Sequence, residues 1–469
     1  MRANELIQFG AVELARLIRH GQVDPIEVVD AHISQIQTVN PRINALITAT
    51  FDEARLEAVR VRRIAKSKVS DLPLLGVPIT VKDALAVGGV RFTAGSTFYR
   101  DNIAGTDAES VRRLRAAGAI VLGKTNCPDM SASTETTNLV FGLTRNPWNP
   151  DRSAGGSSGG EASLIASGGS PLGVGSDFGG SIRIPAAFCG VLGLKPTGGR
   201  IPTQGHLPET PHVISEWNTV GPIARSVEDI ALALSVLSNT QTGDYRAVEL
   251  SQRRFLLPKF LWYQPVSDDV AAAVETAAAA LRSAGMVGAR ASLPLMKVDL
   301  DYIGVLSREW LHLFRAALGG GQPLQFHQEL LSRWSGKPRV SSAGLIALAT
   351  LSLFCPMVQM LGYGRFDRMQ RMRCVIQESM GPGGVMLWPV FPTTAPKHGF
   401  AWNLSKSPSY TTVFNGLGFP ALAMPVGLSK DGQPLSVQII GQPNEDETVL
   451  AVAAALERAF GGWRRPPIS

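Results

Sequence analysis

The stretch AGGSSGGEASLIASGGSPLGVGSDFGGSIRIP, residues 154–185, decides how the chain is interpreted. Seventeen of its 32 residues are glycine or serine, a composition typical of flexible linkers. Apolar residues nevertheless recur at the spacing of packed elements. SLIASGG predicts the end of a short helix, and PLGVGSD predicts a buried strand. We therefore place the stretch inside a domain rather than between two domains.

Strands and helices alternate on both sides of this stretch. Before it, LLGVPITVK (74–82) and AAGAIVLGKTN (116–126) predict strands, and a helix starts at the capping residue Asp24 and stops near Asn40. After it, VMLWPVF and ALAMPVGL predict strands, Asp431-Gly432 marks a turn into LSVQIIG, and DETVLAVAAALERAFGG predicts a closing helix. The pattern predicts an α/β fold with a large twisted mixed sheet flanked by helices on both faces.

The composition limits the function. The 469 residues are 45% hydrophobic and 18% charged, as in ordinary globular proteins, and the net charge is +7. No basic arm interleaved with aromatic residues accompanies that charge, so we expect no nucleic-acid partner. The first residues, MRANELIQFG, contain no apolar signal-peptide core, and we therefore expect a cytoplasmic protein.

The cysteines and histidines predict no metal site. The cysteines are far apart and form no Cys-x-x-Cys pair, which predicts reduced, packed thiols at Cys127, Cys189, Cys355 and Cys374. No His-Glu-x-x-His motif or other metal-ligand spacing occurs. We therefore expect neither a metal ion nor an organic cofactor.

A phosphate-binding loop is the first functional alternative for the glycine-rich stretch. A Walker loop would need Gly-Lys-Ser/Thr at its end, but Gly160 is followed by Glu161. A dinucleotide fingerprint that opens at Gly173 would need its third glycine at the position of Phe178. Both kinds of phosphate site are therefore excluded, and catalytic serines are the remaining functional alternative.

A serine nucleophile needs a base, and histidine is the usual one. Residues 156–160 fit the Gly-x-Ser-x-Gly elbow of α/β hydrolases, but NPWNPDRSA before them predicts a loop where that elbow needs a strand. No histidine lies between His32 and His206. A histidine-based elbow is therefore disfavoured.

Lysine is the other candidate base. Its amine accepts a proton at neutral pH only if burial lowers its pKa well below the ~10.4 of a free lysine. Lys82 and two rivals, Lys124 and Lys195, each lie at or near the end of an apolar strand. These residues alone leave the choice among the three lysines open.

Three ordered blocks carry a family resemblance: GVPITVKD, NPWNPDRSAGGSSGG and GSDFGGSIRIPAAFCGVLGLKPTGGR. In sequence and spacing they resemble the amidase signature family of serine hydrolases. The resemblance implies a single amidase-signature domain over residues 1–469, with a catalytic core at 60–240. It also implies a diverged, mostly helical insert or lid region at 240–380.

The family's Ser-cisSer-Lys triad falls on Ser181, Ser157 and Lys82, and the resemblance implies a cis peptide bond before Ser157. In that mechanism neutral Lys82 takes a proton from Ser157, which takes one from Ser181. Ser181 then attacks the amide carbonyl, and water hydrolyses the acyl-enzyme. The glycine turn before Ser181 points backbone N–H groups inward, which predicts an oxyanion hole formed by Phe178, Gly179, Gly180 and Ser181.

Three neighbours of the triad are interpreted as supporting residues. Ser158 is expected to hydrogen-bond near the lysine. Asp177 and Arg183 are expected to pair and hold the turn. For all three, a structural role is favoured over a direct part in catalysis.

The resemblance also suggests a substrate class. FPTTAPKHG and ERAFGGW resemble the fatty acid amide hydrolase branch of the family, particularly its second type. This implies apolar, fatty-acyl or aryl, amides as small-molecule substrates. Two alternatives stay open: a hydrolase of small aliphatic or aromatic amides or amide-esters, as in secondary-metabolite or xenobiotic pathways, and a glutamine-amidotransferase subunit of a multi-subunit complex.

The apolar segment at 343–364 is long enough to span a bilayer. Pro356 and Gln359 argue against spanning, and a buried helix pair is the favoured interpretation. A lid over an acyl channel and a peripheral membrane contact are the alternatives. His398 and Trp402 are candidate pocket residues, and a homodimer stays open.

Overall fold

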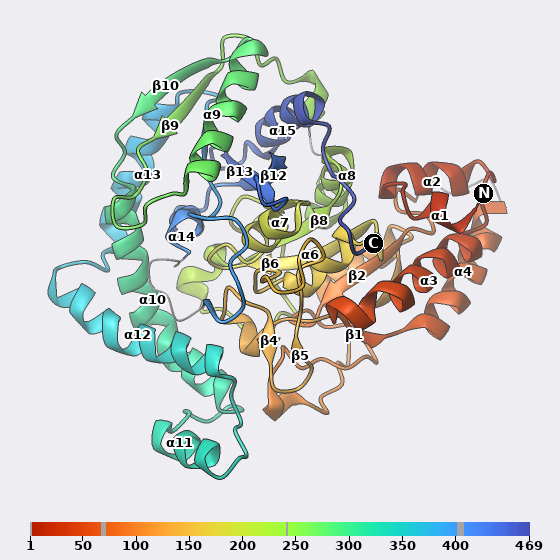
Figure 1. Cartoon of the computed structure of the whole chain (residues 1–469), viewed down its shortest axis with the longest axis horizontal. Coiled ribbons are helices and arrows are strands. Elements are labelled where there is room, and N and C mark those ends of the chain that lie inside the picture. Colours follow the sequence, from red (N-terminus) through yellow and green to blue (C-terminus); the bar gives the residue numbers. More distant parts are fainter. Residues whose placement is uncertain (1, 67–71, 241–242, 401–407) are drawn as a thin grey trace.

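The computed structural model describes residues 2–66, 72–240, 243–400 and 408–469 (Figure 1). Its centre is a mixed sheet of eleven strands. In spatial order the strands are β1 (Leu46–Ala49), β3 (Ile120–Thr125), β2 (Pro78–Lys82), β6 (Leu172–Asp177), β8 (Thr219–Ala224), β7 (Leu192–Lys195), β12 (Ala421–Leu428), β13 (Pro434–Ile440), β11 (Val385–Pro389), β9 (Arg254–Pro258) and β10 (Val287–Ala291).

The pairing of these strands confirms the predicted mixed sheet. β2 pairs parallel with β3 and β6, and β9 pairs parallel with β10 and β11. Between these parallel groups, β8, β7, β12 and β13 pair antiparallel. β12 and β13 form the predicted hairpin, with Gly432 at φ +70° in its turn. The carboxyl ends of β2 and β6 therefore meet at one edge of the sheet.

Helices cover both faces of the sheet. On one face lie α8 (Val227–Ser238), α9 (Asp268–Ser283) and α15 (Asp446–Phe460), and on the other lie α6 (Gly159–Ala166) and α7 (Arg183–Cys189). Strand β12 separates the two layers: Leu422 and Met424 belong to the core under the first group, and Ala423 belongs to the core around α6 and α7. The alternation follows from the two-residue period of a strand.

The N-terminal part adds a further group of helices (Figure 1). These are α1 (Ala3–Leu6), α2 (Ala11–Arg19), α3 (Pro25–Ile43), α4 (Phe51–Lys66) and α5 (Glu109–Ala116). Asp24 caps α3 as predicted, because its side chain accepts a hydrogen bond from the Ile26 N–H at 2.9 Å. The predicted stop near Asn40 is too early. The helix continues through Pro41 to Ile43 and ends at Asn44, whose φ of +50° is left-handed.

Residues 240–380 contribute β9, β10 and α9 to the main body and form a second helical layer beside it. That layer contains α10 (Leu295–Leu318), α11 (Phe326–Trp334), α12 (Ser342–Met360) and α13 (Phe366–Met380), next to α14 (Ser409–Gly416). Figure 1 shows α11 and α12 projecting from the body. An aromatic-rich core lies beneath this layer and includes Trp310, Phe314 and Tyr410.

The segment 343–364 does not form the expected buried helix pair. It folds as the single helix α12, which packs against α10. By length and composition α12 is the one helix in the described part of the chain that could cross a membrane, and a quarter of it is buried. Leu353 is 75% exposed and Met360 is 89% exposed, although the second half of α12 still contacts α10, where the Gln359 side-chain amide donates to the Gly304 carbonyl at 3.2 Å.

Candidate active site

Lys82 is the last residue of β2 and is fully buried. Its Nζ is hydrogen-bonded to Ser157 Oγ at 2.6 Å and to Ser176 Oγ at 3.0 Å. Burial lowers the pKa of Lys82 to about 8, and the negative charges of Asp177 and Glu161 partly oppose this shift. Near pH 7, the neutral fraction of the Lys82 amine is therefore larger than that of an ordinary lysine.

Ser157 lies just before α6, after a cis Gly156–Ser157 peptide bond, as the resemblance implied. A side chain at Gly156 would meet the backbone of Ser133 and Glu135 at 2.6 and 2.9 Å, so this position needs glycine. The next residue, Ser158, connects the turn before α6 to the turn that contains Ser181, because its N–H donates to the Ser181 carbonyl at 3.0 Å.

The turn between β6 and α7 carries Ser181. Gly180 in this turn has φ +114°, and a side chain there would run into Thr411. The Gly180 N–H donates to Asp177 Oδ1 at 2.7 Å. In the described part of the chain, no such partner is recorded for the N–H groups of Phe178, Gly179 and Ser181. Three of the four N–H groups expected in the oxyanion hole therefore have no protein partner among the described residues, while Gly180 holds the turn together.

Asp177 and Arg183 form the expected ion pair, at 2.9 Å, and both side chains are fully buried. Burial alone would raise the pKa of Asp177, but the charge and hydrogen bonds of Arg183 hold it below the ordinary value. The remaining Arg183 donors reach Asn415 Oδ1 at 2.6 Å, Thr411 O at 3.1 Å and Gln438 Oε1 at 3.2 Å. The pair is thus fully hydrogen-bonded, which a buried ion pair requires.

Ser158 forms its side-chain hydrogen bond near the lysine, to a residue that contacts Lys82, and not to the amine itself. Its Oγ donates to the Ser176 carbonyl at 3.4 Å. The sequence analysis did not single out Ser176, which contacts Lys82, or the C-terminal partners of Arg183. Asn415 lies on α14 and Gln438 on β13, more than 230 positions along the chain from Arg183, so no local pattern marks them.

The structure separates the three candidate lysines. Lys124 pairs with Asp83 at 3.1 Å and lies over the Phe92 ring. Burial, followed by the charge of Arg183, lowers the pKa of Lys195 to about 7, and its Nζ donates to the Pro196 carbonyl at 2.9 Å. A lowered pKa is thus not sufficient to identify the base, because among the described residues the partner of Lys195 Nζ is a backbone carbonyl and not a serine hydroxyl. Of the three, Lys82 is the one whose Nζ is bonded to serine hydroxyls.

The histidines do not supply a base to Ser181. In the described part of the chain, His206 Nε2 contacts Ser176 Oγ at 2.8 Å, and the two ring nitrogens of His398 contact Glu135 and Pro150 at 2.9 Å each. His398 does not line the apolar cavity next to Ser181 that is described below. Trp402 lies outside the described residues.

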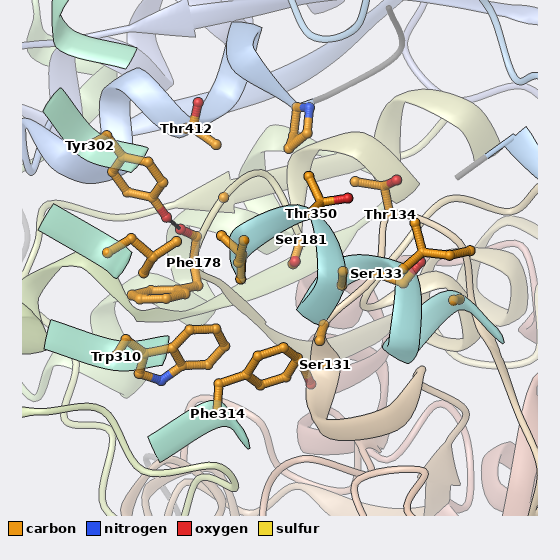
Figure 2. Close-up of a pocket in the computed structure, with 18 residues that line it drawn as sticks. Ser131, Ser133, Thr134, Phe178, Ser181, Tyr302, Trp310, Phe314, Thr350 and Thr412 are labelled. Carbon is orange, nitrogen blue, oxygen red and sulfur yellow. Dashed lines mark hydrogen bonds between the residues drawn. The ribbon is translucent and has the colours of Figure 1, made fainter. Parts of the chain in front are cut away.

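An apolar cavity of about 260 Å³ opens above Ser181 (Figure 2). Its walls combine the catalytic turn, α10 and α12 and include Phe178, Tyr302, Trp310, Phe314, Ile346, Ala347 and Leu351. Tyr302 fixes the turn, because its hydroxyl donates to the Phe178 carbonyl at 2.5 Å. A smaller cavity, of about 30 Å³, is lined by Ser157, Ser176, Ser181 and His206. Ser181 therefore faces both the apolar cavity and the polar cluster around Lys82.

The buried thiols are Cys127 and Cys189, as expected, whereas Cys374 is exposed on α13 and departs from the expectation of packed thiols. Burial raises the pKa of Cys127 to about 12, so this thiol stays protonated beside Lys82. It therefore acts as part of the apolar surroundings of the lysine.

Comparisons with known proteins match nearly the whole chain. The family model described as Amidase matches residues 27–450. Fatty-acid amide hydrolase 2-A of Danio rerio is 34% identical over 99% of this chain and 91% of its own length. A glutamyl-tRNA(Gln) amidotransferase subunit of Sulfurihydrogenibium sp. (strain YO3AOP1) is 31% identical over 96% of both chains. The structure of 6-aminohexanoate cyclic dimer hydrolase with substrate has a TM-score of 0.78 at 30% identity, covering 98% of this chain and 99% of that one.

The mixed α/β fold and the family match define an enzyme that hydrolyses amide C–N bonds. More particularly, the chain belongs to the amidase signature family.

Proposed function

We propose that this amidase hydrolyses amides of apolar carboxylic acids, fatty-acyl or aryl, through Lys82, Ser157 and Ser181. The observation that carries the proposal is the 2.6 Å hydrogen bond between the fully buried amine of Lys82 and Ser157 Oγ. It is supported by the position of Ser181 at the floor of an apolar cavity, close enough to Ser157 for both to line one small cavity.

The proposed reaction runs in two halves. Neutral Lys82 accepts the Ser157 proton, Ser157 accepts the Ser181 proton, and Ser181 Oγ bonds to the amide carbon. The N–H groups of Phe178, Gly179 and Ser181 stabilise the resulting oxyanion. The relay then returns the proton to the leaving nitrogen as the C–N bond breaks. Water attacks the acyl-enzyme by the same relay and releases the acid.

The lining of the cavity supports an apolar acyl group. Phe178 and Trp310 pack with ring centroids 5.2 Å apart, and Trp310 stacks on Phe314 at 4.5 Å, which makes one wall continuous and aromatic. Ile346, Ala347 and Leu351 of α12 form the opposite wall. We propose that α12, within 240–380, is the lid that covers the acyl group.

We expect kcat/KM to rise with acyl length. Each buried methylene contributes about 0.8 kcal/mol, or roughly fourfold, until the cavity is filled. The measurement is kcat/KM across an acyl series with one leaving amine, with acetamide and glutamine as small-substrate references. A flat or falling profile would leave the amidase assignment intact and refute the apolar-acyl substrate. Release of ammonia from glutamine at a comparable rate would instead favour the glutamine-amidotransferase alternative.

A polar substitution on the inner face of α12 is expected to raise KM more for long acyl chains than for short ones. Ile346→Ser places a hydroxyl in the cavity wall that the distal methylenes contact. We expect KM for a long acyl amide to rise about tenfold, the effect of losing one to two buried methylenes, with little change for acetamide. Steady-state kinetics with the two substrates measure this difference.

The matched control lies on the outer face of the same helix. Leu353→Ser changes an apolar residue that does not line the cavity, so the dependence on acyl length should stay as in the wild type.

We also propose that this exposed face, together with Trp334 of α11, contacts a membrane surface. Leu353→Ser should then weaken co-sedimentation with phospholipid vesicles. Equal acyl-length effects of the two variants would refute the lid, and unchanged sedimentation would refute the membrane contact. The homodimer stays a prediction, which light scattering checks.

A further inference from the structure

His206 lies behind the proposed base and is joined to it through one hydroxyl. The ring is buried, its Nε2 lies 2.8 Å from Ser176 Oγ, and Ser176 Oγ lies 3.0 Å from Lys82 Nζ. The reaction proposed above uses Lys82 but neither Ser176 nor His206. These two residues are therefore candidates for a role beside the base.

The neighbours of the ring fix the direction of each hydrogen bond. His206 Nδ1 lies 2.9 Å from the Pro208 carbonyl oxygen, which only accepts, so Nδ1 carries the proton. The amide nitrogen of Asn218 is 3.4 Å from Nδ1, a longer contact than the 2.9 Å to the Pro208 carbonyl, and its shorter bond is to Thr210 Oγ1 at 3.0 Å. In the neutral ring Nε2 then accepts, and the Ser176 hydroxyl must donate to it. The oxygen of Ser176 is left to accept from Lys82.

This direction determines where the lone pair of Lys82 points. A neutral amine has two N–H groups and one lone pair. One N–H is directed at Ser176 Oγ, so the lone pair is available to the Ser157 hydroxyl 2.6 Å away. If Ser176 were free to rotate, its own proton could compete for that lone pair. Lys82 would then be a poorer acceptor for the Ser157 proton.

We propose that His206 is a positioning residue for the amidase reaction, because it holds Ser176 as a donor to its ring and thereby directs the lone pair of Lys82 to Ser157. The proposal rests on the function proposed above. Burial, with a contribution from the charge of Lys82, lowers the pKa of His206 to about 4. The ring consequently stays neutral over the pH range in which Lys82 loses its proton.

The experiment compares His206→Phe, which removes the acceptor, with His206→Gln, whose side-chain oxygen replaces Nε2. We expect His206→Phe to lower kcat about 10- to 100-fold with KM unchanged, the loss typical of a misdirected catalytic group. His206→Gln should recover most of that loss. The apparent pKa of the kcat profile should fall in His206→Phe, because Ser176 then donates to the neutral amine and stabilises it. The other titratable groups facing Lys82, namely Cys127, Glu161 and Asp177, are unchanged.

A double-mutant cycle distinguishes this role from a structural one. If His206 acts through Ser176, adding His206→Phe to a Ser176→Ala variant should lower kcat little further. An equal loss in both backgrounds, or an unchanged pH profile in folded His206→Phe, would overturn the proposal. If His206→Phe does not fold, Ser176→Ala alone decides. Ser176→Ala removes the hydroxyl that accepts the Lys82 N–H, so a lowered kcat with KM unchanged supports the positioning role, and a wild-type kcat overturns it.

The chain offers a matched control in His32. This ring is also fully buried, burial lowers its pKa to about 4, and its Nδ1 contacts the Val28 carbonyl at 2.8 Å. His32→Phe should therefore change thermal stability and leave the pH profile as in the wild type. If Ser181→Ala remains active, the proposed function itself fails. If Ser181→Ala is inactive and His206→Phe is normal, this inference alone fails.

Discussion

Replacing Ser181 with alanine is expected to lower kcat/KM for amide hydrolysis on the order of 10⁴-fold or more, as the loss of a serine nucleophile does in other hydrolases. The loss should appear in kcat, because without Ser181 Oγ no acyl-enzyme forms. The apolar cavity stays intact, so binding of a long-chain acid as an inhibitor should be unchanged. Folding should also persist, because the turn is held by the Asp177–Arg183 pair and not by the Ser181 hydroxyl.

A fluorophosphonate probe gives an independent measurement of the same residue. The wild type should gain one covalent phosphonyl group on the peptide that contains Ser181, and Ser181→Ala should gain none. Ser163→Ala is the matched control, since Ser163 lies on α6 and donates to the Arg145 carbonyl away from the cavity. Near-normal turnover by Ser181→Ala would move the search for the nucleophile to Ser157 and Ser158.

The sheet was largely predictable because its strands are short apolar runs bounded by glycine and proline. PLGVGSD and LLGVPITVK appear as β6 and β2, side by side and parallel, with their last residues at the same edge. This placement brings Lys82 and the Ser181 turn together. The end of α3 was less predictable, because Pro41, a residue that usually marks a helix end, lies inside the last turn, and the helix continues past it to Ile43.

Contacts made over long sequence distances were beyond the sequence analysis. Burial suggested a lowered pKa for three lysines, but the Asp83 partner of Lys124 and the backbone carbonyl partner of Lys195 depend on the fold. The same holds for α12, whose apolar composition fits a core helix as well as a lid. Its packing along α10 leaves Leu353, Met357 and Met360 exposed and places Ile346, Ala347 and Leu351 in the wall of the cavity.

Replacing Lys82 with methionine is expected to lower kcat on the order of 10³-fold, the contribution of a general base. In the wild type the neutral fraction of Lys82 rises as pH rises through its pKa of about 8. The logarithm of kcat/KM should therefore rise with unit slope below pH 8 and level off above it. With the ~10.4 of a free lysine, activity would still be rising at pH 10. The measurement is the pH profile of kcat/KM for both proteins. In Lys82→Met the rise of kcat/KM below pH 8 should be absent.

The stabilities of the Lys82 and Lys124 variants should differ in the opposite sense to their activities, which distinguishes the two lysines. The folded-state pKa of Lys82 lies below its unfolded value, so the unfolded chain binds the extra proton between about pH 8 and the ordinary lysine value. This group therefore adds to stability as pH rises through that window and opposes folding below it. Lys82→Met removes the penalty, and its melting temperature at pH 7 should not fall. Lys124→Met leaves the buried Asp83 without its cation and should destabilise the fold by about 3–5 kcal/mol, with kcat little changed in the folded fraction. An active Lys82→Met beside an inactive but stable Lys124→Met would assign the base to the other strand.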